Sequence, residues 1–201
     1  MREKYQAEIE ERINNFKPGH AFSAMDFIDI ADTDPTNKAL SRLCGSMAIR
    51  RIIQGIYDKP VYSKLLGEYG APNIEEVVGA LVRKFNWTIA PEGETALNYL
   101  RLSTQVPNSW SYISDGPYRK YVIGKYQVEF KHCANKEITG KSYITVSVIQ
   151  AIKYIGKDNI QKDDITMLSN ILSKEEKKTV LRESMTTTVW IYKIIKEVCG
   201  Q

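Results

Sequence analysis

The sharpest local folding signal in the chain is the Asp34-Pro35 pair. Asp is preferred directly before a helix because its carboxylate accepts hydrogen bonds from the free backbone N–H groups of the first turn. Pro suits the first helical position, where its missing N–H costs no hydrogen bond. Gly45 is a typical helix stop. The sequence therefore predicts a helix over residues 35–44.

Apolar and polar residues separate onto two faces of this expected helix. Ala39, Leu40 and Leu43 follow a helical spacing and are expected to face the core. The opposite face is expected to point outward, and its residues are polar or basic: Asn37, Lys38, Ser41 and Arg42. Such a helix can pack on a core and still present hydrogen-bonding groups to a partner.

Two β-rich runs follow the helix, over residues 48–53 and 56–60. Gln54-Gly55 separates them, and a short turn that contains glycine predicts a β-hairpin. Upstream, an apolar stripe at helical spacing predicts a helix over residues 1–16. The order of elements is then helix, short helix, helix with a polar outer face, and hairpin.

The short second helix is predicted from Ser23, which is followed three residues later by Asp26 in the pattern of a capping box. With this element, residues 1–63 match the order of a winged helix-turn-helix. We therefore expect a winged helix-turn-helix domain over residues 1–63. A second, mixed α/β domain is expected over residues 64–201.

Positive charge is concentrated around the predicted helix and hairpin. Residues 35–64 contain six basic residues and one acidic residue, a net charge of +5. Residues 1–34 contain four basic and eight acidic residues, a net charge of −4, and the whole chain carries +4. A local surplus of this kind is typical of a surface that binds phosphate groups.

The residue types on the predicted helix suit double-stranded DNA. The major groove accepts one α-helix, where Asn addresses adenine and Arg addresses guanine with two hydrogen bonds each. Ser, Lys and Arg hold phosphates and fix the register of the protein. The predicted DNA-binding residues are Thr36, Asn37, Lys38, Ser41, Arg42, Arg50, Arg51 and Lys59.

The second region is expected to begin with a linker over residues 65–73 and to end in helices. Its expected helices cover residues 74–85, 91–102, 142–155, 162–172 and 174–198. Its expected strands cover residues 87–90, 110–114, 120–123 and 127–132. The predicted fold class of the whole chain is therefore α+β.

Common catalytic motifs are missing from the sequence. It contains no glycine-rich phosphate loop and no G-x-S-x-G elbow. Gly45-Ser46 followed by Asp58 resembles the metal-binding pattern of nucleotidyltransferases, but Pro60 occupies the position of the second carboxylate. We therefore expect a protein that is not an enzyme and that uses no cofactor.

Cysteine and histidine are too sparse for a metal site. Cys44, Cys133 and Cys199 are isolated, and His20 and His132 lie far apart. Unpaired cysteines fit a reducing cytoplasm, and no apolar run approaches the length that spans a bilayer. We expect a cytoplasmic protein with no metal and no membrane partner.

Several segments in a consistent order resemble AbiEi-like antitoxins, which belong to abortive-infection, type IV toxin-antitoxin systems of bacteria. The N-terminal segments are residues 37–43 (NKALSRL), 49–51 (IRR) and 55–60 (GIYDKP). Further segments are residues 65–67 (LLG), 96–98 (ALN), 102–107 (LSTQVP) and 114–117 (SDGP). The likeness covers about residues 5–155.

The resemblance implies a protein of two domains. The first would bind an operator and repress the protein's own operon, and five positions match the family's basic DNA-facing segment: Lys38, Ser41, Arg42, Arg50 and Arg51. The second would counteract a toxin that resembles a nucleotidyltransferase, without requiring a stable complex. The alternative is a stand-alone winged-helix regulator whose C-terminal region senses a ligand or mediates oligomerisation.

Overall fold

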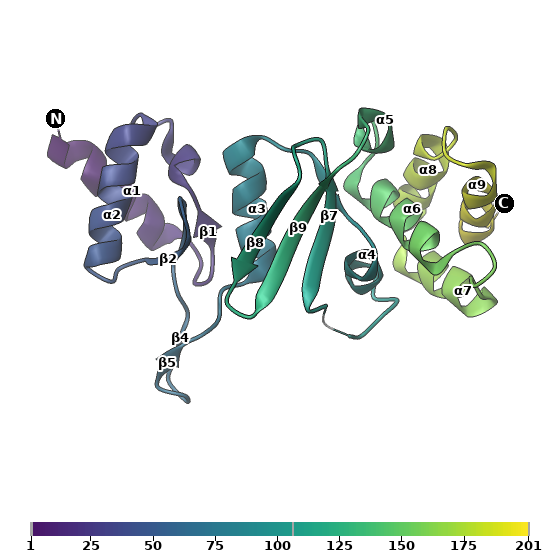
Figure 1. Cartoon of the computed structure of the whole chain (residues 1–201), viewed down its shortest axis with the longest axis horizontal. Coiled ribbons are helices and arrows are strands. Elements are labelled where there is room, and N and C mark those ends of the chain that lie inside the picture. Colours follow the sequence, from purple (N-terminus) through teal and green to yellow (C-terminus); the bar gives the residue numbers. More distant parts are fainter. Residues whose placement is uncertain (1, 106, 201) are drawn as a thin grey trace. The chain divides into compact units, whose positions relative to one another are not determined.

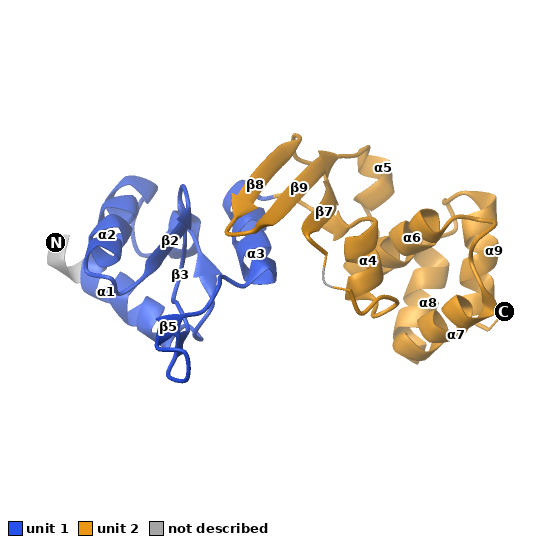
Figure 2. Cartoon of the chain, turned by 60° about the horizontal axis from the view of Figure 1, so that its bottom comes forward, with its two compact units in different colours: residues 1–86 blue, residues 87–201 orange. Residues whose placement is uncertain are grey.

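The structure, a computed structural model, describes residues 2–105 and 107–200. It divides into two compact units, residues 1–86 and residues 87–201 (Figure 2). Met1 and Gln201, the outer ends of the two expected domains, and Val106, within one of the segments that carry the resemblance, lie outside the described residues.

The first unit combines helices with short antiparallel strands (Figure 1). Its helices are α1 (Arg2–Asn15), the 3₁₀ helix η1 (Ala24–Phe27), α2 (Thr33–Gly45) and α3 (Ile74–Phe85). Its strands are β1 (Ala21–Phe22), β2 (Arg50–Ile53), β3 (Ile56–Asp58), β4 (Tyr62–Ser63) and β5 (Glu68–Tyr69).

The central sheet of this unit has the order β1-β3-β2, with both pairs antiparallel. Together with the element order α1, β1, η1, α2, β2, β3, this is the topology of a winged helix-turn-helix. The expected fold of this segment is therefore confirmed. Its core is apolar: Ile9, Phe22, Phe27 and Leu40 are buried side by side between the helices and the sheet.

The start of η1 forms as predicted. Ser23 accepts a hydrogen bond from the backbone N–H of Met25, and the Asp26 carboxylate accepts one from the backbone N–H of Ser23. This reciprocal cap satisfies N–H groups that have no partner inside the short helix. The local sequence was therefore a sufficient guide to this element.

The start of α2 differs from the prediction. The helix begins at Thr33, after the N-cap residue Asp32, which makes no side-chain capping bond. Asp34 is therefore not the cap, and Pro35 lies at the third helical position rather than the first. Pro is tolerated there because the first four N–H groups of a helix have no intrahelical acceptor.

The end of the first unit also differs from the expectation. Strand β5 lies within the linker expected over residues 65–73, where it pairs antiparallel with β4, just before that segment. Helix α3 has the predicted bounds but packs on β1 and η1, so that it belongs to the first unit. The compact unit therefore ends at Asn86, beyond the expected boundary after residue 63.

The second unit is a mixed sheet followed by a helical region (Figure 1). Its strands are β6 (Ile89–Pro91), β7 (Ser109–Ser114), β8 (Arg119–Ile123) and β9 (Tyr126–His132). Its helices are α4 (Glu94–Tyr99), α5 (Asn135–Ile138), α6 (Tyr143–Ile155), α7 (Lys162–Ile171), α8 (Lys174–Glu183) and α9 (Val189–Val198).

The sheet order is β6-β7-β9-β8, in which β7 and β9 are parallel and the other neighbours are antiparallel. The mixed α+β class is as expected. One helix expected over residues 174–198 is instead the pair α8 and α9. Ser184 is the C-cap of α8, and Thr188 is the N-cap of α9. Thr188 is the last of three consecutive threonines, whose β-branched side chains disfavour a continuous helix.

Helix α6 lies at the centre of the helical region of this unit. Its apolar residues, such as Ile152, share a core with α4, α7, α8 and α9. Within residues 2–105 and 107–200, the helices lack the length and apolarity needed to cross a membrane.

Candidate nucleic-acid interface

The outward face of α2 has the predicted composition. Asn37, Lys38 and Ser41 are exposed, whereas Ala39 and Leu40 on the opposite side are buried in the core of the unit. The burial of that apolar side fixes the rotation of the helix. Consequently, the polar side chains are held on the surface in a defined direction.

These side chains line a groove with a volume of about 750 Å³, which we call the α2 groove. One wall is α2, with Asn37, Lys38 and Ser41. The other walls are the β2–β3 hairpin, which contributes Arg51, and the end of α3, which contributes Lys84. The groove therefore brings together four of the predicted DNA-binding residues and one further basic residue, Lys84, that was not predicted.

The charge of the α2 groove is predominantly positive. Three of its lining residues are basic, Lys38, Arg51 and Lys84, and one is acidic, Asp34. Arg51 is exposed, with its guanidinium 5.9 Å from the centre of the Tyr57 ring. Because the Tyr57 ring carries no net charge, this cation–π contact does not neutralise Arg51.

Arg50 does not share the groove with Arg51. Successive side chains of a strand point to opposite faces, and Arg50 forms a two-point ion pair with Asp58 at 3.1 and 2.6 Å. It also donates to the Gly70 carbonyl oxygen at 2.8 Å. In this structure Arg50 therefore holds the sheet to the following segment, rather than presenting its charge to the groove.

Three other predicted residues also lie outside the groove lining. Thr36 is fully buried and donates its hydroxyl to the Ala31 carbonyl at 3.2 Å, so its side chain does not reach the surface. The Lys59 ammonium donates to two carbonyl oxygens at the end of α1. Arg42 is exposed and donates to the Gln6 side chain at 3.0 Å.

Lys84 is the residue that sequence reasoning missed. Its ammonium donates to the Gln54 carbonyl at 3.3 Å, directly over the hairpin turn. Burial lowers its pKa below the ordinary value of a lysine. No local pattern around Lys84 points to this position, because it depends on the packing of α3 against a segment about 30 residues earlier.

The second unit contains a separate polar cleft of about 590 Å³. Two ion pairs line it, Glu92 with Lys131 at 3.2 Å and Glu137 with Lys153 at 2.9 Å. Cys133 also lines it, and burial, followed by the charges of Glu137 and Asp115, raises the pKa of this thiol. A thiol with a raised pKa is a weak nucleophile.

Among the described residues, no group of three or more His, Cys, Asp or Glu side chains could hold a metal ion.

Comparison with known proteins places the chain in a family. A family model described as "Family of unknown function (DUF6088)" matches residues 8–180. The chain belongs to this family. Searches of curated proteins and of solved structures found no match. The match of the DUF6088 family extends over the α2 groove and most of the second unit.

Proposed function

We propose that this DUF6088 protein binds double-stranded DNA through the α2 groove. The observation that carries the proposal is the placement of the exposed polar side of α2 beside Arg51 of the β2–β3 hairpin, within a winged helix-turn-helix topology. In such domains the second helix of the motif enters the major groove. In this chain α2 is the second helix of the motif, after η1.

The chemistry of the groove supports this proposal. Asn37 can read an adenine with two hydrogen bonds, whereas Lys38 and Ser41 suit phosphate oxygens. Arg51 on the hairpin suits the neighbouring phosphate backbone or the minor groove. We do not include Thr36 or Arg50 in the interface, because one is buried and the other is paired with Asp58.

For the biological role, we propose an AbiEi-like antitoxin that represses its own operon and counteracts a nucleotidyltransferase-like toxin. The support is the resemblance described above, whose segments fall in both units. Residues 37–43 lie within α2, and residues 96–98 lie within α4 of the second unit. On this proposal the DNA-binding role belongs to the first unit and the antitoxin role to the second.

The test combines a gel shift with a rescue assay. The full chain should shift the DNA directly upstream of its gene and should restore growth to cells that express the toxin encoded beside it. Asn37→Ala should relax sequence preference, at about 1–3 kcal/mol for a lost two-point base contact. It should leave rescue intact. Absence of any DNA shift at low salt would sink the DNA-binding role.

A stand-alone regulator is the second candidate function. The polar cleft of the second unit favours it, because paired Glu and Lys side chains around a cleft can exchange their ion pairs for those of a charged small molecule. DNA binding together with failure to rescue cells from the neighbouring toxin would favour this regulator over the antitoxin.

A further inference from the structure

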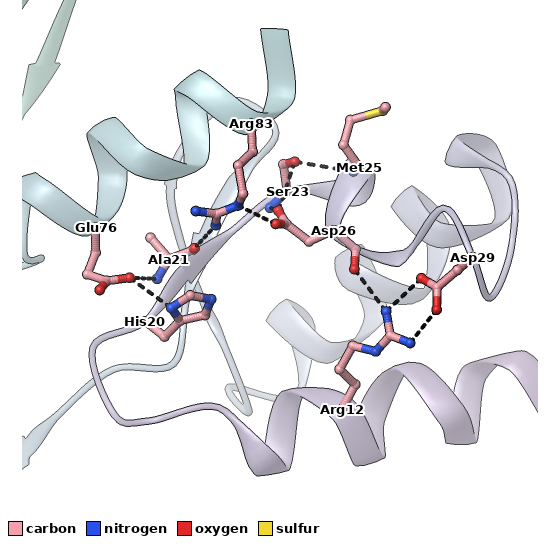
Figure 3. Close-up of polar contacts among 9 residues, drawn as sticks. All are labelled: Arg12, His20, Ala21, Ser23, Met25, Asp26, Asp29, Glu76 and Arg83. Atoms are coloured by element: carbon pink, nitrogen blue, oxygen red, sulfur yellow. Dashed lines mark hydrogen bonds and ion pairs between the residues drawn. The ribbon is translucent and has the colours of Figure 1, made fainter. Parts of the chain in front are cut away.

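Helix α3 is fastened to the helix-turn-helix by polar contacts near both of its ends (Figure 3). Near its start, Glu76 accepts a hydrogen bond from the Ala21 backbone N–H and pairs with His20 at 2.8 Å. Near its end, Arg83 pairs with the Asp26 carboxylate and donates to the Ala21 carbonyl at 2.8 Å. The helix is therefore held in place relative to η1 and β1.

This attachment fixes the residue that follows Arg83. The Lys84 side chain extends to the hairpin turn, where its ammonium donates to the Gln54 carbonyl. The contact is close, since a Cβ added at Gly55 would lie 2.6 Å from the Lys84 ammonium. Lys84 is thus positioned between α3 and the hairpin, at the wall of the α2 groove.

The described contacts of Lys84 do not neutralise its charge: besides the hydrogen bond to Gln54, its ammonium lies 5.2 Å from the centre of the Phe85 ring, which carries no net charge. Lys84 is partly buried, and within residues 2–105 and 107–200 its polar partner is a neutral carbonyl rather than a carboxylate. By contrast, the neighbouring Arg83 is already paired with Asp26. A partly desolvated cation without an acidic partner is stabilised by an incoming anion. The two other basic groups of the groove, Lys38 and Arg51, make the same face attractive to a phosphate chain.

We propose that Lys84 is a phosphate-binding residue of the duplex interface, so that α3 contributes directly to DNA binding. This inference rests on the proposed DNA-binding function. It adds a contact from a helix that follows the winged helix-turn-helix in the chain. The ligand group is a backbone phosphate of double-stranded DNA.

The experiment compares full-length variants on a short duplex of mixed sequence, with dissociation constants measured by fluorescence anisotropy. Lys84→Gln removes the charge, and Lys84→Arg retains it. Lys17→Gln is the matched control, because Lys17 is an exposed lysine of the same unit outside the groove lining. Affinities are measured over a salt series, since each phosphate contact adds about −0.9 to the slope of log K against log salt.

The expected result is a shallower salt dependence for Lys84→Gln alone. Losing one phosphate contact should reduce the affinity change between about 50 and 200 mM salt by about 3.5-fold relative to wild type. Lys84→Arg and Lys17→Gln should retain the wild-type slope. The slope of the salt dependence is decisive because Lys84→Gln also removes the hydrogen bond to Gln54. A purely structural effect of that loss would lower the affinity but would leave the slope unchanged.

Each alternative outcome has a distinct meaning. Wild-type affinity and slope in Lys84→Gln would overturn the inference and leave the proposed DNA binding intact. Lower affinity with an unchanged slope would also overturn it, since Lys84 would then act only by holding the hairpin. If the wild-type chain shows no salt-dependent binding to the duplex, the proposed DNA-binding function itself fails.

Discussion

Replacement of Arg50 by Met should destabilise the first unit, although Arg50 was predicted from sequence to contact DNA. Its guanidinium donates one hydrogen bond to each carboxylate oxygen of Asp58, whose side chain is only 1% exposed. Removing one partner of a buried pair leaves an uncompensated buried charge. This costs about 3–5 kcal/mol of the free energy of unfolding.

The structure places the expected loss at the lower end of that range. The Arg50 side chain is 30% exposed, so its removal lets water approach the freed Asp58 carboxylate. We therefore expect a loss of about 3 kcal/mol. Arg51→Met is the matched control, because this neighbouring arginine is exposed and should change stability by about 0.5 kcal/mol or less.

Hydrogen exchange of the β2 and β3 backbone amides is the suitable assay. A loss of about 3 kcal/mol should accelerate their exchange roughly a hundredfold where exchange follows opening of the unit. Tryptophan fluorescence provides an internal control. Trp87, Trp110 and Trp190 all belong to the second unit, so their emission during denaturant unfolding reports on that unit and not on β2 and β3.

The double variant Arg50→Met/Asp58→Asn tests the assigned cause. Because the amide removes the buried charge, it should recover most of the stability lost in the single variant. Exchange rates in Arg50→Met within about twofold of wild type, corresponding to about 0.4 kcal/mol, would refute the argument that the buried ion pair holds this sheet together.

Three further variants test other parts of the structure. Ser23→Ala removes the cap of η1 and should cost about 1 kcal/mol, measured by hydrogen exchange of that segment. Gly55→Ala should cost more than about 1 kcal/mol, seen as a lower melting temperature by circular dichroism, because φ is +73° and the Lys84 ammonium must move. Burial would raise the pKa of Glu183, but hydrogen bonds from Ser142 and Thr145 leave it below its ordinary value. The stability contributed by ionised Glu183 is therefore present above about pH 4.5 and lost as pH falls through the lower folded-state pKa. In thermal melts followed by tryptophan emission, which comes from the second unit, Glu183→Gln should be less stable than wild type near neutral pH and should converge with it in acid.

Local sequence was sufficient for elements whose signals lie within a few residues. The bounds of α3 agree with the prediction over residues 74–85, and Asn73 caps its first turn by accepting from the N–H groups of Glu75 and Glu76. The β2–β3 hairpin also forms around the expected turn. A helical repeat or a turn depends mainly on neighbouring residues, which the sequence displays directly.

The membership of the candidate interface needed the tertiary structure. Strand alternation indicates that Arg50 and Arg51 cannot share a face, but only the position of Asp58 decides which of them is paired. The burial of Thr36 and the approach of Lys84 to Gln54 depend on how helices pack, not on local spacing. The sequence alone determined that a polar helix and a basic hairpin adjoin each other. Long-range packing decided which of their charges remain available to a ligand, because a charge that is already neutralised by a distant partner looks the same in the sequence as a free one.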